Sequence, residues 1–137
     1  MRFVRPKSLS YQETIRFHGH DGPFLALGYK LGRFVVKTFR PKGIMDFKIT
    51  VRTRAKKPFT CLIDGLQCIT FATTGKANML IKKCRSKDII VFVENNKRKY
   101  RYKITQKAMN ICLNADDLHK AAQKIFRTPA KDLWNIL

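Results

Sequence analysis

The organising segment of the sequence is Pro23-Phe24-Leu25-Ala26-Leu27-Gly28-Tyr29-Lys30-Leu31-Gly32-Arg33-Phe34-Val35-Val36. Apolar side chains recur in it at three- and four-residue spacing, and its proline suits a first helical turn, so it predicts a helix with an apolar face. Gly28 and Gly32 lie one turn apart, and each destabilises the helix by about 1 kcal/mol relative to alanine. Because they share a face, close approach of another backbone segment would compensate, and we predict a tight packing seam there.

Shorter segments on both sides of this helix show helical or strand patterns. Ser8 and Ser10 can cap a helix of about two turns within residues 8–17, and the alternating run from Met45 to Arg52 predicts a strand. The later segments predict, in order, a mostly buried helix over 61–72 that stops near Gly75, a short strand over 78–83, a hairpin of strands 88–94 and 98–104, helices that start at Thr105 and at Asp116, and a last short helix from Thr128 that holds Trp134. This order predicts an α+β fold in which a small, mostly antiparallel sheet packs with helices.

Size and composition limit the classes of protein. The 137 residues suit a single domain over 1–137, and the 45% of hydrophobic residues suffice for a core. No apolar run approaches the roughly 18 residues of a membrane-spanning helix, and the first residues lack a signal-peptide pattern, so we expect a cytoplasmic protein without a membrane partner. Lys and Arg number 29 against 9 acidic residues, and the net charge of +20 attracts polyanions.

The clearest candidates for chemistry are two histidines and a cysteine. An i, i+2 pair such as His18 and His20 can direct both imidazoles to one side, which suits a metal ion; the alternative is a turn with one solvated ring. Cys61 is the best third ligand, because cations of the preceding basic segment would stabilise its thiolate; the alternative is a small buried hydrophobic residue. Without a CxxC pair or a secretory signal, we expect all four cysteines to be reduced thiols. Two imidazoles and one thiolate leave an open position on zinc, nickel, cobalt or ferrous iron.

Polar residues after the cysteine extend this candidate site. Asp64 can share its helix face, as a metal ligand, a hydrogen-bond partner of an imidazole or a helix-start acid, and Gln67 continues that face. The segment Thr73-Thr74-Gly75-Lys76-Ala77-Asn78 is superficially similar to a phosphate loop but lacks the Walker A glycine spacing. Lys76, or the helix start at Pro23, is a candidate contact for a small anionic ligand.

Two ordered motifs resemble a known family. Residues 17–32, Phe17-His18-Gly19-His20-Asp21-Gly22-Pro23-Phe24-Leu25-Ala26-Leu27-Gly28-Tyr29-Lys30-Leu31-Gly32, are similar to the opening motif of the FmdE family of formylmethanofuran dehydrogenase proteins. The second motif of that family, with Cys, Asp, Gln and Thr ahead of Thr-Gly-Lys-x-Asn, resembles Cys61-Leu62-Ile63-Asp64-Gly65-Leu66-Gln67-Cys68-Ile69-Thr70 followed by Thr74-Gly75-Lys76-Ala77-Asn78. The resemblance covers roughly residues 8–105.

The resemblance implies an α+β fold and a divalent transition metal, zinc first. Its ligands would be His18, His20 and Cys61, supported by Asp64 and Gln67, with Thr74, Lys76 and Asn78 as further ligand-binding residues. It also implies an accessory or subunit protein of molybdenum- or tungsten-enzyme C1 metabolism, within a larger redox complex. The redox reaction of that complex belongs to its other chains, and this one lacks iron–sulfur spacing.

The sequence departs from the family pattern in two places. Gly22 stands where many members have a cysteine just before the proline, which removes one candidate thiolate ligand. The cysteine-rich zinc module that often follows the core is missing from this sequence.

Two further hypotheses concern partners. The run Arg98-Lys99-Tyr100-Arg101-Tyr102-Lys103 interleaves cationic and aromatic residues on a predicted strand, which is typical of a surface that binds phosphates and stacks bases. The alternative is a solvated strand face whose tyrosines pack inward. A homodimer would form through the helix that carries Gly28 and Gly32 or through an edge strand.

Overall fold

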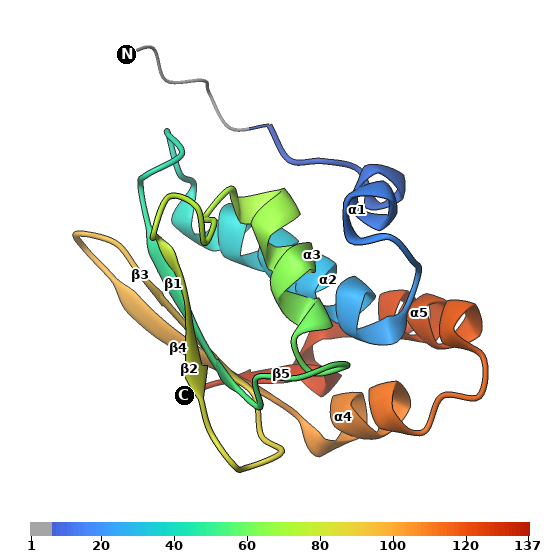
Figure 1. Cartoon of the computed structure of the whole chain (residues 1–137). Coiled ribbons are helices and arrows are strands. Elements are labelled where there is room, and N and C mark those ends of the chain that lie inside the picture. The colour runs from blue at the N-terminus through green and yellow to red at the C-terminus, as the bar shows by residue number, and fades with distance from the viewer. Residues whose placement is uncertain (1–6) are drawn as a thin grey trace.

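The protein, described by a computed structural model over residues 7–137, stacks its α-helices on one side of a five-stranded sheet (Figure 1). The elements in chain order are α1 (Tyr11–His18), α2 (Pro23–Phe39), β1 (Lys48–Thr53), α3 (Cys61–Thr70), β2 (Met79–Lys83), β3 (Ile90–Glu94), β4 (Lys99–Ile104), α4 (Gln106–Leu113), α5 (Leu118–Arg127), a 3-10 turn (Ala130–Asp132) and β5 (Trp134–Ile136). The predicted α+β fold is confirmed. No helix within residues 7–137 is both long and apolar enough to cross a membrane.

The sheet has the strand order β2-β1-β3-β4-β5. β1 and β2 are parallel and the other neighbours are antiparallel, so the prediction of a mostly antiparallel sheet is confirmed. Parallel neighbours need a crossover connection, and α3 supplies it between β1 and β2. The crossover leads from the end of β1 to the start of α3, and therefore to Cys61.

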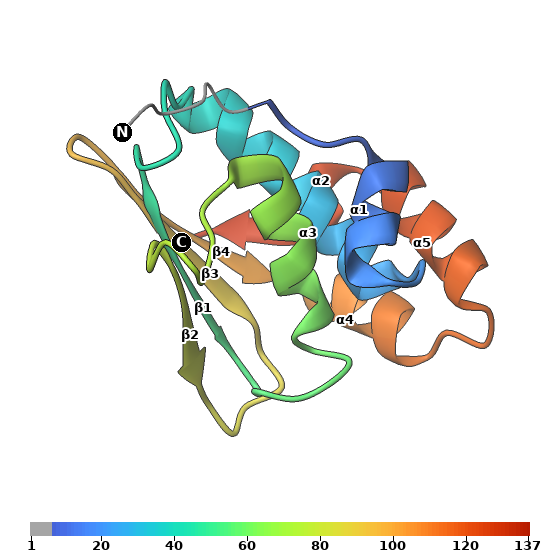
Figure 2. The same ribbon diagram turned by 45° about the horizontal axis from the view of Figure 1, so that its top comes forward.

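The helices form two layers over the sheet, as Figure 2 shows: α2 and α3 lie next to the strands, and α1 and α5 lie outside them. One hydrophobic cluster joins these layers to the inner face of the sheet. Its fully buried members include Leu27, Leu31, Leu62, Leu66, Ile49, Val51 and Val91. Burying these side chains supplies most of the driving force for folding, and it leaves the opposite face of the sheet without a helical cover.

The predicted seam lies between α2 and α3. A Cβ atom on Gly28 would overlap the Leu62 carbonyl oxygen, and one on Gly65 would lie 2.5 Å from the Leu25 carbonyl oxygen. At Gly32 the nearest atom would be Ile69 Cβ, at 3.0 Å. Because α3 fills this face, the Gly28 and Gly32 face cannot form the homodimer interface that the sequence suggested.

Local hydrogen bonds set the end of α1 and thereby the position of His18. Ser10 caps the helix: its hydroxyl accepts from the Glu13 backbone N–H, and the Glu13 carboxylate accepts from the Ser10 N–H. At the other end, Gly19 takes the left-handed conformation (φ 106°), which glycine adopts without strain. The chain can therefore turn sharply after one histidine and place the next one beside it.

Replacing Ser10 with alanine is expected to lower the free energy of unfolding by about 1 kcal/mol, because one N-terminal N–H of α1 loses its acceptor. Urea unfolding followed by circular dichroism measures this loss. Ser86→Ala is the control, because the Ser86 hydroxyl accepts only from the Asp88 N–H in an exposed loop. Equal stability of the two variants would contradict a stabilising role for the cap.

The α3 helix ends earlier than the sequence suggests. The predicted stop near Gly75 is wrong: α3 ends at Thr70, and Phe71 takes the left-handed conformation (φ 59°) with its N–H bonded to the Gln67 carbonyl oxygen. The Thr70 hydroxyl bonds the Leu66 carbonyl oxygen and accepts from the Ala72 N–H. These bonds satisfy the groups that would otherwise continue the helix.

The predicted C-terminal helix around Trp134 is also wrong. Only a 3-10 turn, Ala130–Asp132, follows Pro129, and Trp134 begins β5, where it pairs with Ile104 of β4. The Trp134 ring is 4% exposed and packs edge-on against Phe34 of α2, at a centroid distance of 5.4 Å. Pairing with the edge of β4 satisfies backbone groups and buries a large ring, and these gains outweigh the short local helical pattern.

Candidate metal centre

The candidate ligands His18, His20 and Cys61 come together where the loop between α1 and α2 meets the first turn of α3. His18 ends α1, His20 follows the turn at Gly19, and Cys61 is the first residue of α3. A hollow of about 440 Å³ opens here. Its other lining residues are Lys57, Thr60, Ile63, Asp64, Gln67, Thr74 and Ile81.

The ligand atoms lie close enough to share one ion. One imidazole nitrogen each of His18 and His20 and the Cys61 Sγ atom all lie within 4.8 Å of one another. The two Nε2 atoms are 3.1 Å apart. Two nitrogens bound at 2.0–2.1 Å on a tetrahedral ion would be about 3.3 Å apart, so the rings already have almost the required separation.

Hydrogen bonds at the far side of each ring determine which nitrogen carries the proton. His18 Nδ1 lies 2.6 Å from an Asp64 carboxylate oxygen, and His20 Nδ1 lies 2.8 Å from the Asp21 carbonyl oxygen. Both partners are acceptors, so each Nδ1 must donate. In the neutral rings the two Nε2 lone pairs then face each other at 3.1 Å, which is repulsive unless a cation or a proton lies between them. The donor set therefore fits a metal ion.

A chain of hydrogen bonds holds the His18 ring in place. Asp64 accepts from His18 through one oxygen, and its other oxygen accepts from Gln67 Nε2 at 3.3 Å. The Gln67 side-chain oxygen, Oε1, in turn accepts from the Thr74 backbone N–H at 2.9 Å. Carboxylates that orient a metal-binding imidazole in this way fix its tautomer and raise its basicity. Of the three roles considered for Asp64, the geometry favours the hydrogen-bond partner.

Cys61 is buried, with 8% of its surface exposed. Burial and, second, the Asp64 carboxylate raise the pKa of its thiol, while Lys57 and the Cys61 backbone N–H act in the opposite direction. The expectation that basic neighbours would stabilise a Cys61 thiolate is therefore wrong for the metal-free protein, because desolvation outweighs Lys57. A metal ion that binds here must displace the thiol proton.

Asp21 anchors the histidine loop to two helices, a role that the sequence motif did not reveal. Its carboxylate accepts from the Tyr11 hydroxyl of α1 at 2.5 Å and lies 2.6 Å from His119 Nδ1 of α5. Burial and the Asp21 carboxylate raise the pKa of Tyr11 well above its ordinary value. The loop that carries His20 is thus fixed from both sides, and only the tertiary packing of α1 and α5 makes these contacts.

Lys76 and Asn78 lie outside this hollow. Lys76 Nζ donates to the Phe71 carbonyl oxygen and to Thr73 Oγ1, at 2.6 and 2.9 Å. These bonds stabilise the segment that follows the end of α3. The Asn78 side chain is buried and bonds backbone groups of Thr73, Ile44 and Phe47. These bonds hold together the loop that precedes β2.

The lysine that lines the hollow is Lys57, which the sequence motifs did not single out. The signal was present in the basic run Arg54-Ala55-Lys56-Lys57 ahead of Cys61, but its side-chain directions could not be known. The helix start at Pro23 lines a different hollow of about 230 Å³, which also contacts His20, Cys61 and Cys112. A Cβ atom on Gly22 would lie 3.5 Å from His20 Cε1, so a side chain at this position would contact the ring.

The basic strand of the nucleic-acid hypothesis divides between two faces of the sheet. Tyr102 is fully buried and Tyr100 is half-buried, and both rings pack toward α2, where their neighbours include Phe34 and Phe39. Base stacking on Tyr102 is therefore excluded. The side chains of Lys99, Arg101 and Lys103 alternate with the tyrosines and lie on the other face, and Arg98 Nη2 donates to the Thr38 carbonyl oxygen. The four cysteines, all within residues 7–137, form no disulfide.

A protein-family model matches a segment that contains both motifs. The family model described as "FmdE, Molybdenum formylmethanofuran dehydrogenase operon" matches residues 17–134. The chain belongs to the FmdE family. The FmdE match runs past residue 105, the limit of the motif resemblance, and includes α4, α5 and the start of β5. No curated protein matches the chain.

Proposed function

We propose that this FmdE-family chain acts as a single domain over residues 1–137 and holds one divalent transition ion, zinc first, with His18, His20 and Cys61. The observation that carries the proposal is the pair of Nε2 atoms at 3.1 Å, whose rings both donate through Nδ1. A buried thiol within 4.8 Å completes a donor set of two nitrogens and one sulfur, which is typical of zinc sites with an open position.

When bound, the ion supplies a Lewis acid with one coordination position free for a ligand. Asp64 holds the His18 ring in its metal-binding tautomer. Lys57 and Thr60, which line the hollow beside Cys61, are the residues available to orient a small anionic ligand. In the cell we propose an accessory or subunit role in C1 metabolism of molybdenum or tungsten enzymes, in keeping with the family description.

Elemental analysis of protein purified without an affinity tag tests the metal proposal directly. We expect about one zinc, or one competing transition ion, per chain. Reconstitution with Co²⁺ adds a readout of the ligands, because a bound thiolate gives a near-ultraviolet charge-transfer band. Protein that is folded, binds no Zn²⁺ or Co²⁺ in titrations and shows no such band would refute the proposal.

Asp64→Asn is expected to weaken zinc binding about 10- to 100-fold, because the amide keeps the shape but lacks the charge that orients His18 and raises its basicity. Competition with a chromophoric chelator measures the affinity. Asp46→Asn, in an exposed loop, is the matched control and should bind zinc like the wild type. Unchanged affinity of Asp64→Asn would show that the carboxylate does not support the site.

A further inference from the structure

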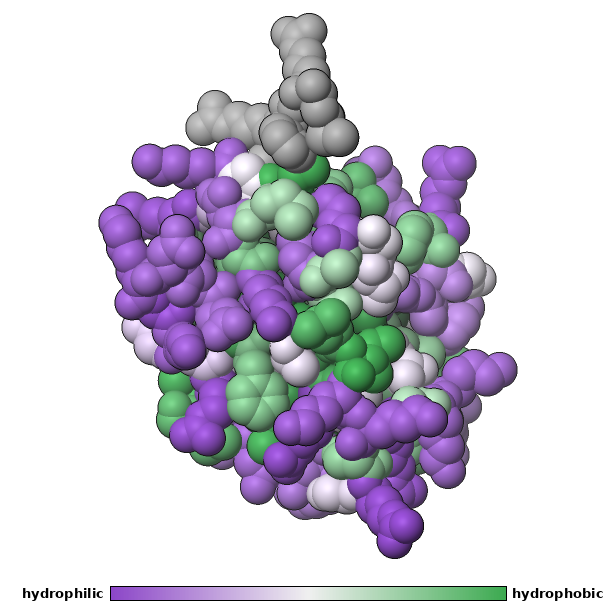
Figure 3. All heavy atoms as spheres, turned by 60° about the vertical axis from the view of Figure 1, so that its left-hand side comes forward, coloured by the Kyte–Doolittle hydropathy of each residue, from purple (hydrophilic) through white to green (hydrophobic). Residues whose placement is uncertain are grey.

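The face of the sheet that points away from the helices has a composition unlike a simple solvated face. On the four longest strands its outward side chains comprise six cations, one carboxylate and several apolar groups; the cations are Lys48, Arg52, Lys82, Lys99, Arg101 and Lys103. Figure 3 shows this side of the molecule, with a hydrophobic patch surrounded by hydrophilic side chains. The face is independent of the metal centre, which lies on the helical side.

Strand register places an aromatic ring in the middle of this face. Phe92 of β3 lies opposite Thr50 of β1 on one side and opposite Arg101 of β4 on the other, and Leu80 of β2 extends the same row beyond Thr50. Phe92 is partly exposed, and Leu80 is 38% exposed. Because Val91 and Val93 face the core, alternation along β3 turns Phe92 outward.

The next row is cationic. Lys82, Arg52, Ile90 and Lys103 lie side by side across β2, β1, β3 and β4. The cations of this face that form ion pairs with carboxylates are both on β4: Lys103 lies 3.7 Å from Asp88, and Lys99 lies 3.6 Å from Glu94. Within residues 7–137, Arg52 and Lys82 have no ion-pair partner, and the buried Nε atom of Arg52 has no hydrogen-bond acceptor.

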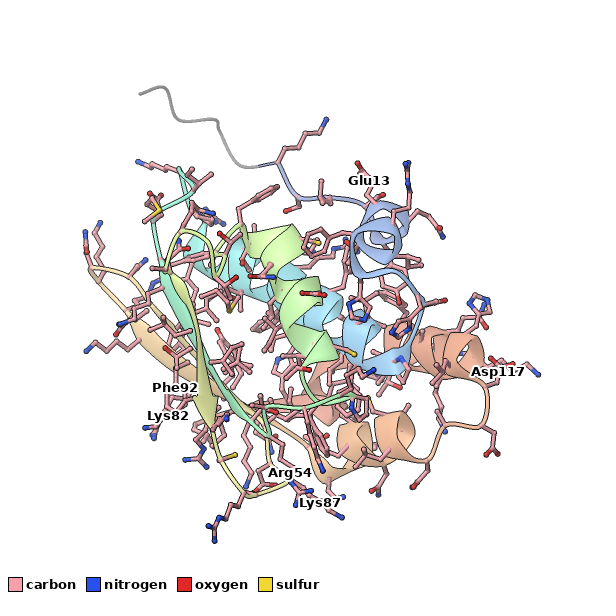
Figure 4. All side chains as sticks on the ribbon, in the orientation of Figure 1. Glu13, Arg54, Lys82, Lys87, Phe92 and Asp117 are labelled. Atoms are coloured by element: carbon pink, nitrogen blue, oxygen red, sulfur yellow. The ribbon has the colours of Figure 1, made fainter. Side chains whose placement is uncertain are left out.

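The positive charge continues beyond the ends of β1 and β2. The two parallel strands finish at the same end of the sheet, and the loops after them border an open hollow of about 660 Å³ lined by Arg54, Lys56, Lys83 and Arg85. Figure 4 shows Lys82 and Phe92 at the side of the sheet away from the helices, with Arg54 and Lys87 at the adjoining end. A negatively charged chain that crosses the sheet into this hollow would therefore stay close to cationic side chains along its whole path.

We propose that this open sheet face binds single-stranded nucleic acid, with a base stacked on Phe92 and phosphates bound by Lys82, Arg52 and Arg101. A pleated sheet face with a partly exposed aromatic ring among cationic side chains is the arrangement that base stacking and phosphate contacts require. Charge alone would also suit an acidic protein. The ring in the centre of the cations favours bases, because stacking adds an attraction that a carboxylate-rich surface does not use.

The test is fluorescence anisotropy of zinc-loaded protein with a labelled 12-nucleotide oligo(dT) or oligo(U), at salt concentrations from 50 to 200 mM. We expect Phe92→Leu, which keeps an apolar side chain but removes the ring, to bind about tenfold more weakly. We expect the double variant Lys82→Glu, Arg101→Glu to bind the oligonucleotide more weakly still. Its slope of log affinity against log salt should be smaller by about two.

Two controls make the result specific. The pair Lys120→Glu and Lys124→Glu on α5 changes the net charge equally on the helical side and should bind like the wild type. Thermal melting shows whether each variant is folded. The proposal would be overturned if both charge-reversal pairs lost the same affinity, or if folded Phe92→Leu bound with unchanged affinity. Displacement of the oligonucleotide by polyglutamate at equal charge would also overturn it, in favour of an acidic protein partner.

Discussion

Gly28→Ala is expected to prevent stable folding, although alanine is the better helix former. The substitution gains about 1 kcal/mol of helix propensity. Against this, the new methyl group overlaps the backbone carbonyl oxygen of Leu62, which cannot move unless α3 separates from α2. Overpacking against a side chain costs about 1 to 3 kcal/mol, and a clash with the backbone of a buried helix costs more. The clash therefore outweighs the propensity gain.

The expected observation is loss of the cooperative thermal transition, or a melting temperature lower by 10 °C or more, on the scale of roughly 4 °C per kcal/mol for a domain of this size. Gly65→Ala should behave alike, since its Cβ atom would lie 2.5 Å from the Leu25 carbonyl oxygen and 2.6 Å from the Tyr29 nitrogen. Gly75→Ala is the matched control, because no atom lies within 4 Å of its Cβ position. A Gly28→Ala protein as stable as Gly75→Ala would show that the helices are not packed as described.

His18→Ala and Cys61→Ser are each expected to reduce bound zinc from about one ion per chain to a small fraction of that value. Each substitution removes one of the three proposed ligands, and we expect the remaining pair to lose the ion to a chelator. Cys61→Ser also replaces a thiolate with a hydroxyl that does not ionise near neutral pH. Elemental analysis after dialysis against a weak chelator measures the retained metal.

Matched controls separate ligand loss from general damage. Cys84→Ser removes a cysteine in the loop after β2, and Asp46→Asn changes an exposed loop residue; neither residue belongs to the cluster. Both should retain zinc. A chelator should lower the melting temperature of the wild type but not that of Cys61→Ser, because an ion that binds only the folded state stabilises it. Equal zinc in His18→Ala, Cys61→Ser and the controls would remove the proposed site.

The elements of the site differ in how far local sequence could predict them. The cap at Ser10, the proline at the start of α2 and the alternation along β1 are local patterns, and each predicted its element. The end of α3 and the strand at Trp134 depended on partners distant in sequence. The helix can end at Phe71 because Asn78, later in the same loop, accepts a hydrogen bond from the backbone N–H of Thr73. Trp134 forms a strand because its backbone pairs with the edge of β4.

The sequence by itself determined the α+β class, the glycine seam and the candidate ligands, because periodicity, glycine spacing and residue chemistry are properties of short segments. Only the tertiary structure decided that Lys57 rather than Lys76 lines the hollow beside Cys61, that burial raises the pKa of the Cys61 thiol, and that Phe92 rather than Tyr102 lies on the open face. The physical reason is that side-chain direction, desolvation and strand register arise from contacts between segments tens of residues apart. No local pattern encodes those contacts.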